Sequence, residues 1–108
     1  MNLIREVNLL KYIHLNYFSK NIIRKGKGKL VPYKNAIIDL STNSKIIIYD
    51  ENLEIGTGKL KKSKIETLLR LRNNAEWECE KGGQVAYGST IEILDHGFLK
   101  TKFFTMNS

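Results

Sequence analysis

The stretch LRLRNNAEWECEKGGQVAYGSTIEILDHGFL, residues 69–99, decides the fold. It alternates short apolar runs with turn-forming residues such as Asn73-Asn74, Gly82-Gly83 and Asp95-His96-Gly97. Apolar residues recur in it at spacings of six or eight positions, at Leu71, Trp77, Val85, Ile91 and Leu99. A six-residue period with occasional insertions is typical of a parallel β-helix, in which short strands stack turn upon turn.

The same pattern of brief apolar runs begins after Pro32. Each run has the length of a strand, and together they comprise residues 36–38, 46–49, 53–55, 68–72, 77–79, 85–87, 91–93 and 98–99. Eight short strands with frequent turns are compatible with three kinds of fold: a sandwich, a barrel or a solenoid. The shortage of two-residue hairpin turns favours the solenoid slightly, and a small antiparallel β-sandwich or barrel is the alternative.

Composition supports a mainly β fold in one folding unit. The chain of 108 residues contains 13 Ile and only 3 Ala, whereas a helical protein would use more Ala. No apolar run is long enough to cross a bilayer, and Arg5, Glu6 and Lys11 interrupt what would be a signal peptide, so we expect a cytoplasmic protein. The single cysteine and the distant His14 and His96 give no metal-ligand spacing, so we expect no metal site.

The N-terminal third has a different character. Apolar residues recur at helical spacing between Asn2 and Phe18, with polar residues mostly on the other side, which predicts an amphipathic helix with Asn2 as its N-cap. Its apolar positions are Leu3, Val7, Leu10, Ile13 or His14, and Tyr17. We expect this helix to cover the first turn of the β-structure. Residues 24–29 have flexible glycines and repelling charges, which predict an exposed connection. The predicted organisation is a helix and basic connection in residues 1–34, then a β-domain in residues 35–108.

The formal charge of +7 is concentrated at this end of the chain. Residues 1–34 contain 8 Lys/Arg and one acid, whereas residues 35–108 contain 10 basic and 10 acidic residues. Flanking aromatic residues make the basic stretch a candidate surface for single-stranded nucleic acid or another polyanion. The residues of this candidate polyanion or acceptor surface are Arg24, Lys25, Lys27, Lys29 and Lys34. A solvated loop explains the same residues without a ligand.

The remaining motifs have simpler structural explanations. Residues 56–60, GTGKL, lack the first glycine and the Ser/Thr of a phosphate-binding loop, so they predict a turn. Glu76, Glu78 and Glu80 alternate with Trp77 and Cys79, which predicts a solvated acidic face and a buried apolar face of one strand. Cys79 has no nearby histidine to activate it, and His96 suits a polar corner before glycine.

The chain resembles the N-terminal half of bacterial hexapeptide-repeat acyltransferases. The family meant is the one that O-acetylates sugars of capsular or exported polysaccharides. The resemblance is carried, in this order, by residues 69–77, Gly82-Gly83, residues 89–93 and residues 98–108. The resemblance covers most of the chain. It implies a left-handed parallel β-helix that follows the N-terminal helix. It also implies an acetyl-CoA-dependent sugar or polysaccharide O-acetyltransferase that assembles as a trimer.

One part of the family pattern is missing. The Asp-x-Asp-x-His type segment that supplies the family's general base is absent, and neither His14 nor His96 aligns with it, so no catalytic, cofactor-binding or metal residue is assigned. We therefore expect these residues to be the front part of such an enzyme, inactive alone. We expect them to associate through a C-terminal end that exposes Phe103 and Phe104. The rival interpretation is a small basic module that binds nucleic acid or another polyanion.

Overall fold

A computed structural model describes residues 7–57, 66–86 and 88–106. A short α-helix, α2 (Leu9–Ile13), continues as one π-helical turn, η1 (His14–Phe18). The strands are β1 (Ile22–Arg24), β2 (Leu30–Pro32), β3 (Ala36–Leu40), β4 (Lys45–Ile48), β5 (Leu53–Thr57), β6 (Thr67–Leu71), β7 (Glu76–Cys79), β8 (Gly83–Ala86), β9 (Thr90–Ile93), β10 (Phe98–Thr101) and β11 (Phe104–Met106). The protein is mainly β, as its composition predicts.

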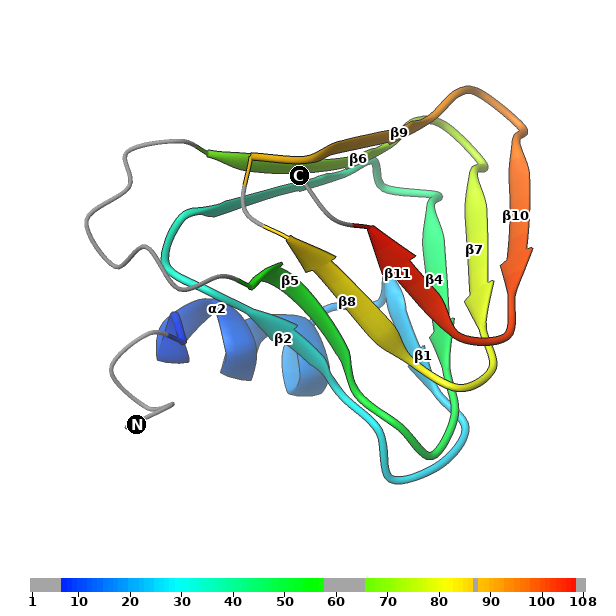
Figure 1. The fold of residues 1–108 in the computed structure, drawn as a ribbon. Coiled ribbons are helices and arrows are strands. Elements are labelled where there is room, and N and C mark those ends of the chain that lie inside the picture. The colour runs from blue at the N-terminus through cyan, green and yellow to red at the C-terminus, as the bar shows by residue number, and fades with distance from the viewer. Residues whose placement is uncertain (1–6, 58–65, 87, 107–108) are drawn as a thin grey trace.

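The strands form three parallel sheets that the chain visits in rotation (Figure 1). The sheet orders are β1-β4-β7-β10, β2-β5-β8-β11 and β3-β6-β9, so each circuit of three strands stacks on the previous circuit. Parallel pairing of every named strand is inconsistent with the antiparallel sandwich or barrel that was the alternative. In the described part of the chain, the antiparallel contact is the isolated bridge between Val7 and Tyr33.

The apolar spacing of the sequence corresponds to successive strands of this winding. Leu71, Trp77, Val85 and Ile91 lie on β6, β7, β8 and β9, and each points into the core. Columns of aligned residues run along each sheet, and one such column is formed by Ile22, Ile46, Trp77 and Leu99. Because aligned positions of parallel strands point to the same side, every inward column adds to one continuous core.

The last turns of the winding close around Trp77, which is fully buried. Its indole Nε1–H donates to Oγ1 of Thr101 (3.0 Å), and its ring meets Phe104 edge-on, with centroids 5.1 Å apart. Gly83 lies between Leu53 and Phe104 in the neighbouring sheet. Its φ of 155° suits glycine, and a Cβ there would collide with the carbonyl oxygen of Phe104. The expected exposure of Phe104 is wrong, because its ring packs against Trp77 and is half-buried, whereas Phe103 is exposed as expected.

One corner of the winding repeats the same tight turn in successive circuits. The amide of Ser44 donates to Ser41, that of Ala75 to Arg72, and that of Gly97 to Leu94. Asn74 and His96 both adopt positive φ, near 60°, at these corners. His96 is exposed, and its backbone N–H donates to the carbonyl of Asn73 (2.9 Å), so the turn explains its position.

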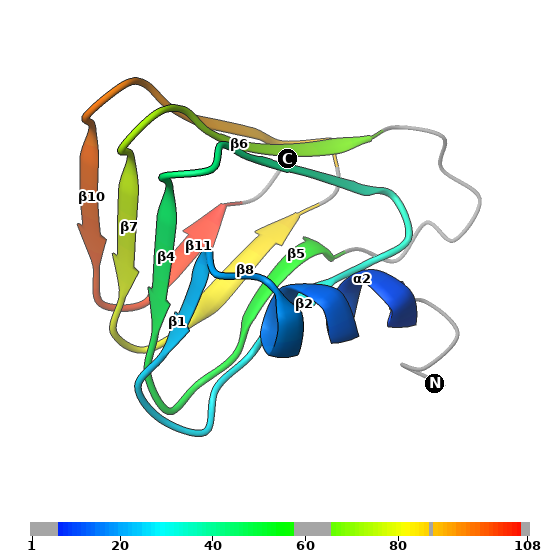
Figure 2. The same ribbon diagram turned by 180° about the vertical axis from the view of Figure 1, so that it is seen from behind.

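The N-terminal helix lies beside β2 at the first circuit, as Figures 1 and 2 show. It begins at Leu9 with Asn8 as its N-cap, because the Asn8 side chain accepts from the amide of Lys11 (3.1 Å). The predicted helix start near Asn2 lies outside the described residues. Strands β1 and β2 pair with β4 and β5, so the winding already includes part of residues 1–34.

Polar side chains of the helix satisfy the backbone of the first circuit. Asn16 is 7% exposed; its amide donates to the carbonyl of Leu30 (2.8 Å) and accepts from the N–H of the same residue (2.9 Å). Lys11 Nζ donates to the carbonyl of Ala36 (2.9 Å), and the amide of Asn8 donates to the carbonyl of Pro32 (2.9 Å). Pro32 lacks an N–H and therefore suits an edge strand.

This arrangement reverses the predicted orientation of the helix. The residues that we expected to face the sheet, Leu10, Ile13 and Tyr17, are exposed, while Asn16 is buried. The reason is that the edge of a sheet presents unpaired N–H and C=O groups, which require polar partners. Among the described residues, no helix is long and apolar enough to span a bilayer.

We predict that Asn16→Ala destabilises the protein by about 2 kcal/mol, because it leaves the N–H and C=O of Leu30 without partners in a buried site. Urea unfolding followed by circular dichroism measures this loss. Asn43→Ala, at an exposed position in the turn before β4, is the matched control and should change stability little. Equal stability of both variants would contradict the capping role.

Candidate polyanion-binding surface

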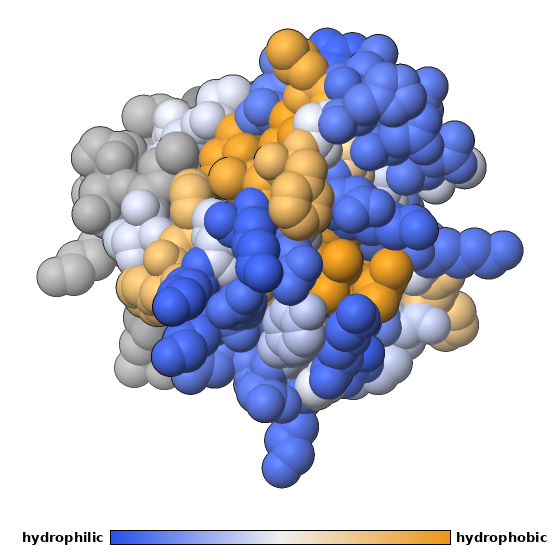
Figure 3. Space-filling view, turned by 90° about the vertical axis from the view of Figure 1, so that its right-hand side faces the viewer, coloured by the Kyte–Doolittle hydropathy of each residue, from blue (hydrophilic) through white to orange (hydrophobic). Residues whose placement is uncertain are grey.

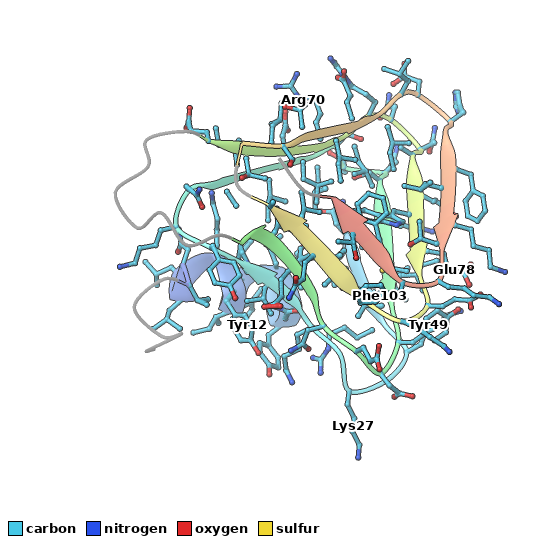
Figure 4. All side chains as sticks on the ribbon, viewed as in Figure 1. Tyr12, Lys27, Tyr49, Arg70, Glu78 and Phe103 are labelled. Atoms are coloured by element: carbon cyan, nitrogen blue, oxygen red, sulfur yellow. The ribbon has the colours of Figure 1, made fainter. Side chains whose placement is uncertain are left out.

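The basic candidate residues lie mainly on the turn between β1 and β2. The next circuit holds this turn in place: the amides of Lys25 and Gly28 donate to the carbonyls of Ile48 and Tyr49, both at 2.7 Å. The amide of Lys29 donates to Oδ1 of Asn52 (2.9 Å). The backbone of the turn is therefore anchored, while the Lys27 side chain extends away from the body of the protein (Figure 4).

Some of the positive charge on this turn is already engaged. The Arg24 guanidinium lies 5.3 Å from the ring centroid of Tyr17, and its Nε–H donates to the carbonyl of Gly28 (3.3 Å). Lys25 Nζ lies 6.0 Å from the ring centroid of Tyr49. The Asp50 carboxylate accepts from the amide of Lys27 (3.3 Å) and lowers the local positive potential. Lys25 and Lys27 are the most accessible cations of the turn.

The fifth candidate residue lies elsewhere. Lys34 is exposed in the turn between β2 and β3, which is the next corner of the winding. The structure thus brings Arg24, Lys25, Lys27 and Lys29 together and separates Lys34 from them. A polyanion that contacts the β1–β2 turn would reach Lys34 only by crossing the β2 face.

The acidic strand behaves as its alternation predicts. Trp77 and Cys79 are fully buried, whereas Glu76 and Glu78 lie on the outer side of β7 and Glu80 directly follows the strand. These outer carboxylates have protein partners: Glu78 accepts from the Tyr49 hydroxyl (2.9 Å), and Glu80 lies 3.4 Å from Lys100 Nζ. Figure 3 views this side of the molecule and shows apolar patches interrupted by hydrophilic residues.

The described residues do not assemble a nucleophilic or metal centre. Burial raises the pKa of the Cys79 thiol, and its Sγ–H donates to the carbonyl of Gly82 (3.1 Å), so the reactive thiolate is disfavoured. His14 lies on η1 and His96 on the corner before β10, both exposed. The described residues hold no group of three His, Cys, Asp or Glu suited to a metal.

The glycine-rich motif at residues 56–60 falls partly outside the described residues. Gly56 belongs to β5, at a shift in its pairing with β8, and has a φ of 93°. A Cβ at Gly56 would lie 2.9 Å from Oδ1 of Asn35. Gly56 thus permits an irregularity within strand β5, whereas we expected a turn at this position.

Sequence reasoning missed the most exposed apolar surface, which lies on the helix of residues 9–18. Apolar periodicity found this face but placed it inward. The signal that could have oriented the helix correctly was polar: Asn8, Lys11 and Asn16 recur on one side, opposite Leu10 and Tyr17.

Comparisons with protein-family models, with curated proteins and with solved structures gave no match.

We predict weak, salt-dependent binding of heparin by the β1–β2 turn. Lys25→Gln/Lys27→Gln should reduce the slope of log affinity against log salt by about 1 to 2, because two cations no longer displace counterions. Lys34→Gln/Lys45→Gln removes the same charge from other exposed positions and serves as the control. Equal losses in both variants, measured by fluorescence titration, would show that net charge alone determines binding.

The pKa of Tyr49 is raised, first because its hydroxyl donates to Glu78 and then through burial and the charges of Glu78 and Glu80. We predict that Glu78→Gln lowers the pKa of Tyr49 toward its ordinary value, measured by carbon-13 NMR of the tyrosine ring. Because the folded pKa is raised, this contact stabilises the fold below pH 10 and is lost as pH rises through the folded pKa.

Tyr12 is the internal control for this titration. Its pKa is raised mainly by burial, with a further contribution from Tyr17, and Arg24 opposes both. Glu78→Gln should leave the Tyr12 pKa where it is. An unchanged Tyr49 pKa would contradict the role of the Glu78 carboxylate.

Proposed function

We propose that this chain is the N-terminal portion of an acetyl-CoA-dependent sugar or polysaccharide O-acetyltransferase and that its winding is a left-handed β-helix. The observation that carries the proposal is the rotation of the chain through three parallel sheets in continuous register. This is the architecture that the resemblance to hexapeptide-repeat acyltransferases implies. The turn-forming residues that suggested it, such as Gly82-Gly83, lie at or beside corners of the winding.

Within this proposal, the described residues act as a scaffold. A general base must reach the hydroxyl proton that it removes. His14 and His96 are exposed on the first helix and on a late corner, and neither has a described hydrogen-bond partner that would orient it as a base. Acetyl-CoA would need cations for its phosphates, but the acidic residues Asp50 and Glu51 lie beside the basic β1–β2 turn. The turn also has no histidine that could act as a general base. These residues do not fit an acetyl-CoA site, so we assign no step of acetyl transfer to them.

The outer edge of the last circuit supports a role in assembly. Strands β9, β10 and β11 are edge strands in their sheets, and Leu94, Phe98 and Phe103 are exposed nearby. Edge strands and apolar side chains of this kind promote association. We expect homo-oligomers, with a trimer as the form that the family implies.

The test uses the gene product as it occurs in its own cell, purified through a tag fused before Met1. We predict transfer of labelled acetyl groups from acetyl-CoA to the cell's own polysaccharide. Residues 1–108 produced alone should show no transfer. Absence of both transfer and acetyl-CoA binding in the native gene product would overturn the proposal, and transfer by residues 1–108 alone would overturn the scaffold role.

A small basic module that binds polyanions is the second candidate. The exposed Lys25 and Lys27 on an anchored turn favour it. Tight retention on nucleic acid at high salt, without acetyl transfer, would support this candidate over the first.

A further inference from the structure

The helix of residues 9–18 presents an apolar face to solvent. Leu10 is 83% exposed and Phe18 is 73% exposed. Five of the large hydrophobic residues that are exposed in the described structure come from this helix: Leu9, Leu10, Ile13, Tyr17 and Phe18. Exposed apolar patches of this density mark sites of interaction with a protein or a membrane.

The protein's own β-structure cannot cover this face. The opposite side of the helix is held by Asn16, whose amide bonds Leu30, and by Lys11, whose ammonium bonds Ala36. Leu15 is buried on that side. Rotating the helix to bury Leu10 would break these bonds and leave the edge of β2 unpaired, so the apolar face is fixed outward.

The segment that carries this face and the strands after it, residues 7–34, has charges of one sign in its sequence. Residues 7–34 contain seven Lys/Arg and no Asp or Glu. The Arg24 guanidinium lies over the ring of Tyr17, which is itself part of the apolar face. Lys20 is exposed two positions after the helix ends. An apolar strip with aromatic residues, bordered by cations, matches the boundary between the acyl chains and the anionic headgroups of a membrane.

We propose that the helix of residues 9–18 lies in the plane of an anionic lipid bilayer, with Leu10, Tyr17 and Phe18 among the acyl chains and Lys20, Arg24 and Lys25 at the headgroups. A second copy of the chain fits this face less well, because each copy would bring the same unbalanced positive charge to the interface. The occupant is therefore an anionic lipid surface. This inference does not depend on the proposed acetyltransferase function.

The test is sedimentation with vesicles of phosphatidylcholine and phosphatidylglycerol, compared with vesicles of phosphatidylcholine alone. We expect the protein to bind the anionic vesicles at least tenfold more tightly, and high salt to weaken this binding. Leu10→Ser/Phe18→Ser should reduce the affinity for anionic vesicles at least tenfold. Both positions are largely exposed, so the fold should persist, and the fluorescence of buried Trp77 checks this.

Leu94→Ser/Phe98→Ser is the matched control, because it removes a Leu and a Phe that are also well exposed, 65% and 60%, at the other end of the winding. It should bind vesicles as the unmodified protein does. Equal binding to both kinds of vesicle, equal loss in both variants, or no loss in Leu10→Ser/Phe18→Ser would overturn the proposal. A dimer that Leu10→Ser/Phe18→Ser abolishes, together with no vesicle binding, would assign the face to a second copy.

Discussion

The pairing of Asn16 with the backbone of Leu30 is the constraint on which the first circuit depends. A stack of parallel strands leaves unpaired N–H and C=O groups at its ends, and burying such groups without partners is costly. The Asn16 amide has the donor and acceptor that Leu30 requires, and it occupies the place that a further strand would take. Its remaining amide hydrogen bonds the carbonyl of Tyr12 (2.8 Å), so the buried side chain is fully satisfied.

This polar contact determines the surface properties of the N-terminal end. Because the polar side of the helix faces the sheet, its apolar side faces outward, and the segment of residues 7–34 to which it belongs contains seven Lys/Arg and no Asp or Glu. Further along the winding the constraint changes from hydrogen bonding to packing. There, Trp77 and Phe104 fill the core, and Gly83 permits the close approach of the backbone of Phe104.

Much of the strand content could be predicted from the sequence, because each of the eight predicted runs overlaps a strand of the structure. The spacing of Leu71, Trp77 and Val85 indicated rungs because inward residues of successive sheets recur at nearly constant intervals. Strands β1, β2 and β11 were missed because each has only three residues, and a lysine- and glycine-rich turn also separates the first two. The predicted orientation of the helix was wrong, because periodicity identifies an apolar face but does not show whether this face meets the sheet or the solvent. The basic stretch could be recognised from the sequence. That its residues lie at two different corners of the winding could be seen only from the order of the strands in the sheets.

Amide hydrogen exchange at Leu30, followed by NMR, measures whether Asn16 completes the first circuit. We expect the Leu30 amide to be protected as strongly as that of Leu53, which donates to the carbonyl of Lys29 (3.0 Å) between two circuits. Exchange of Leu30 at the rate of an exposed edge amide, while Leu53 stays protected, would show that Asn16 does not complete the first circuit.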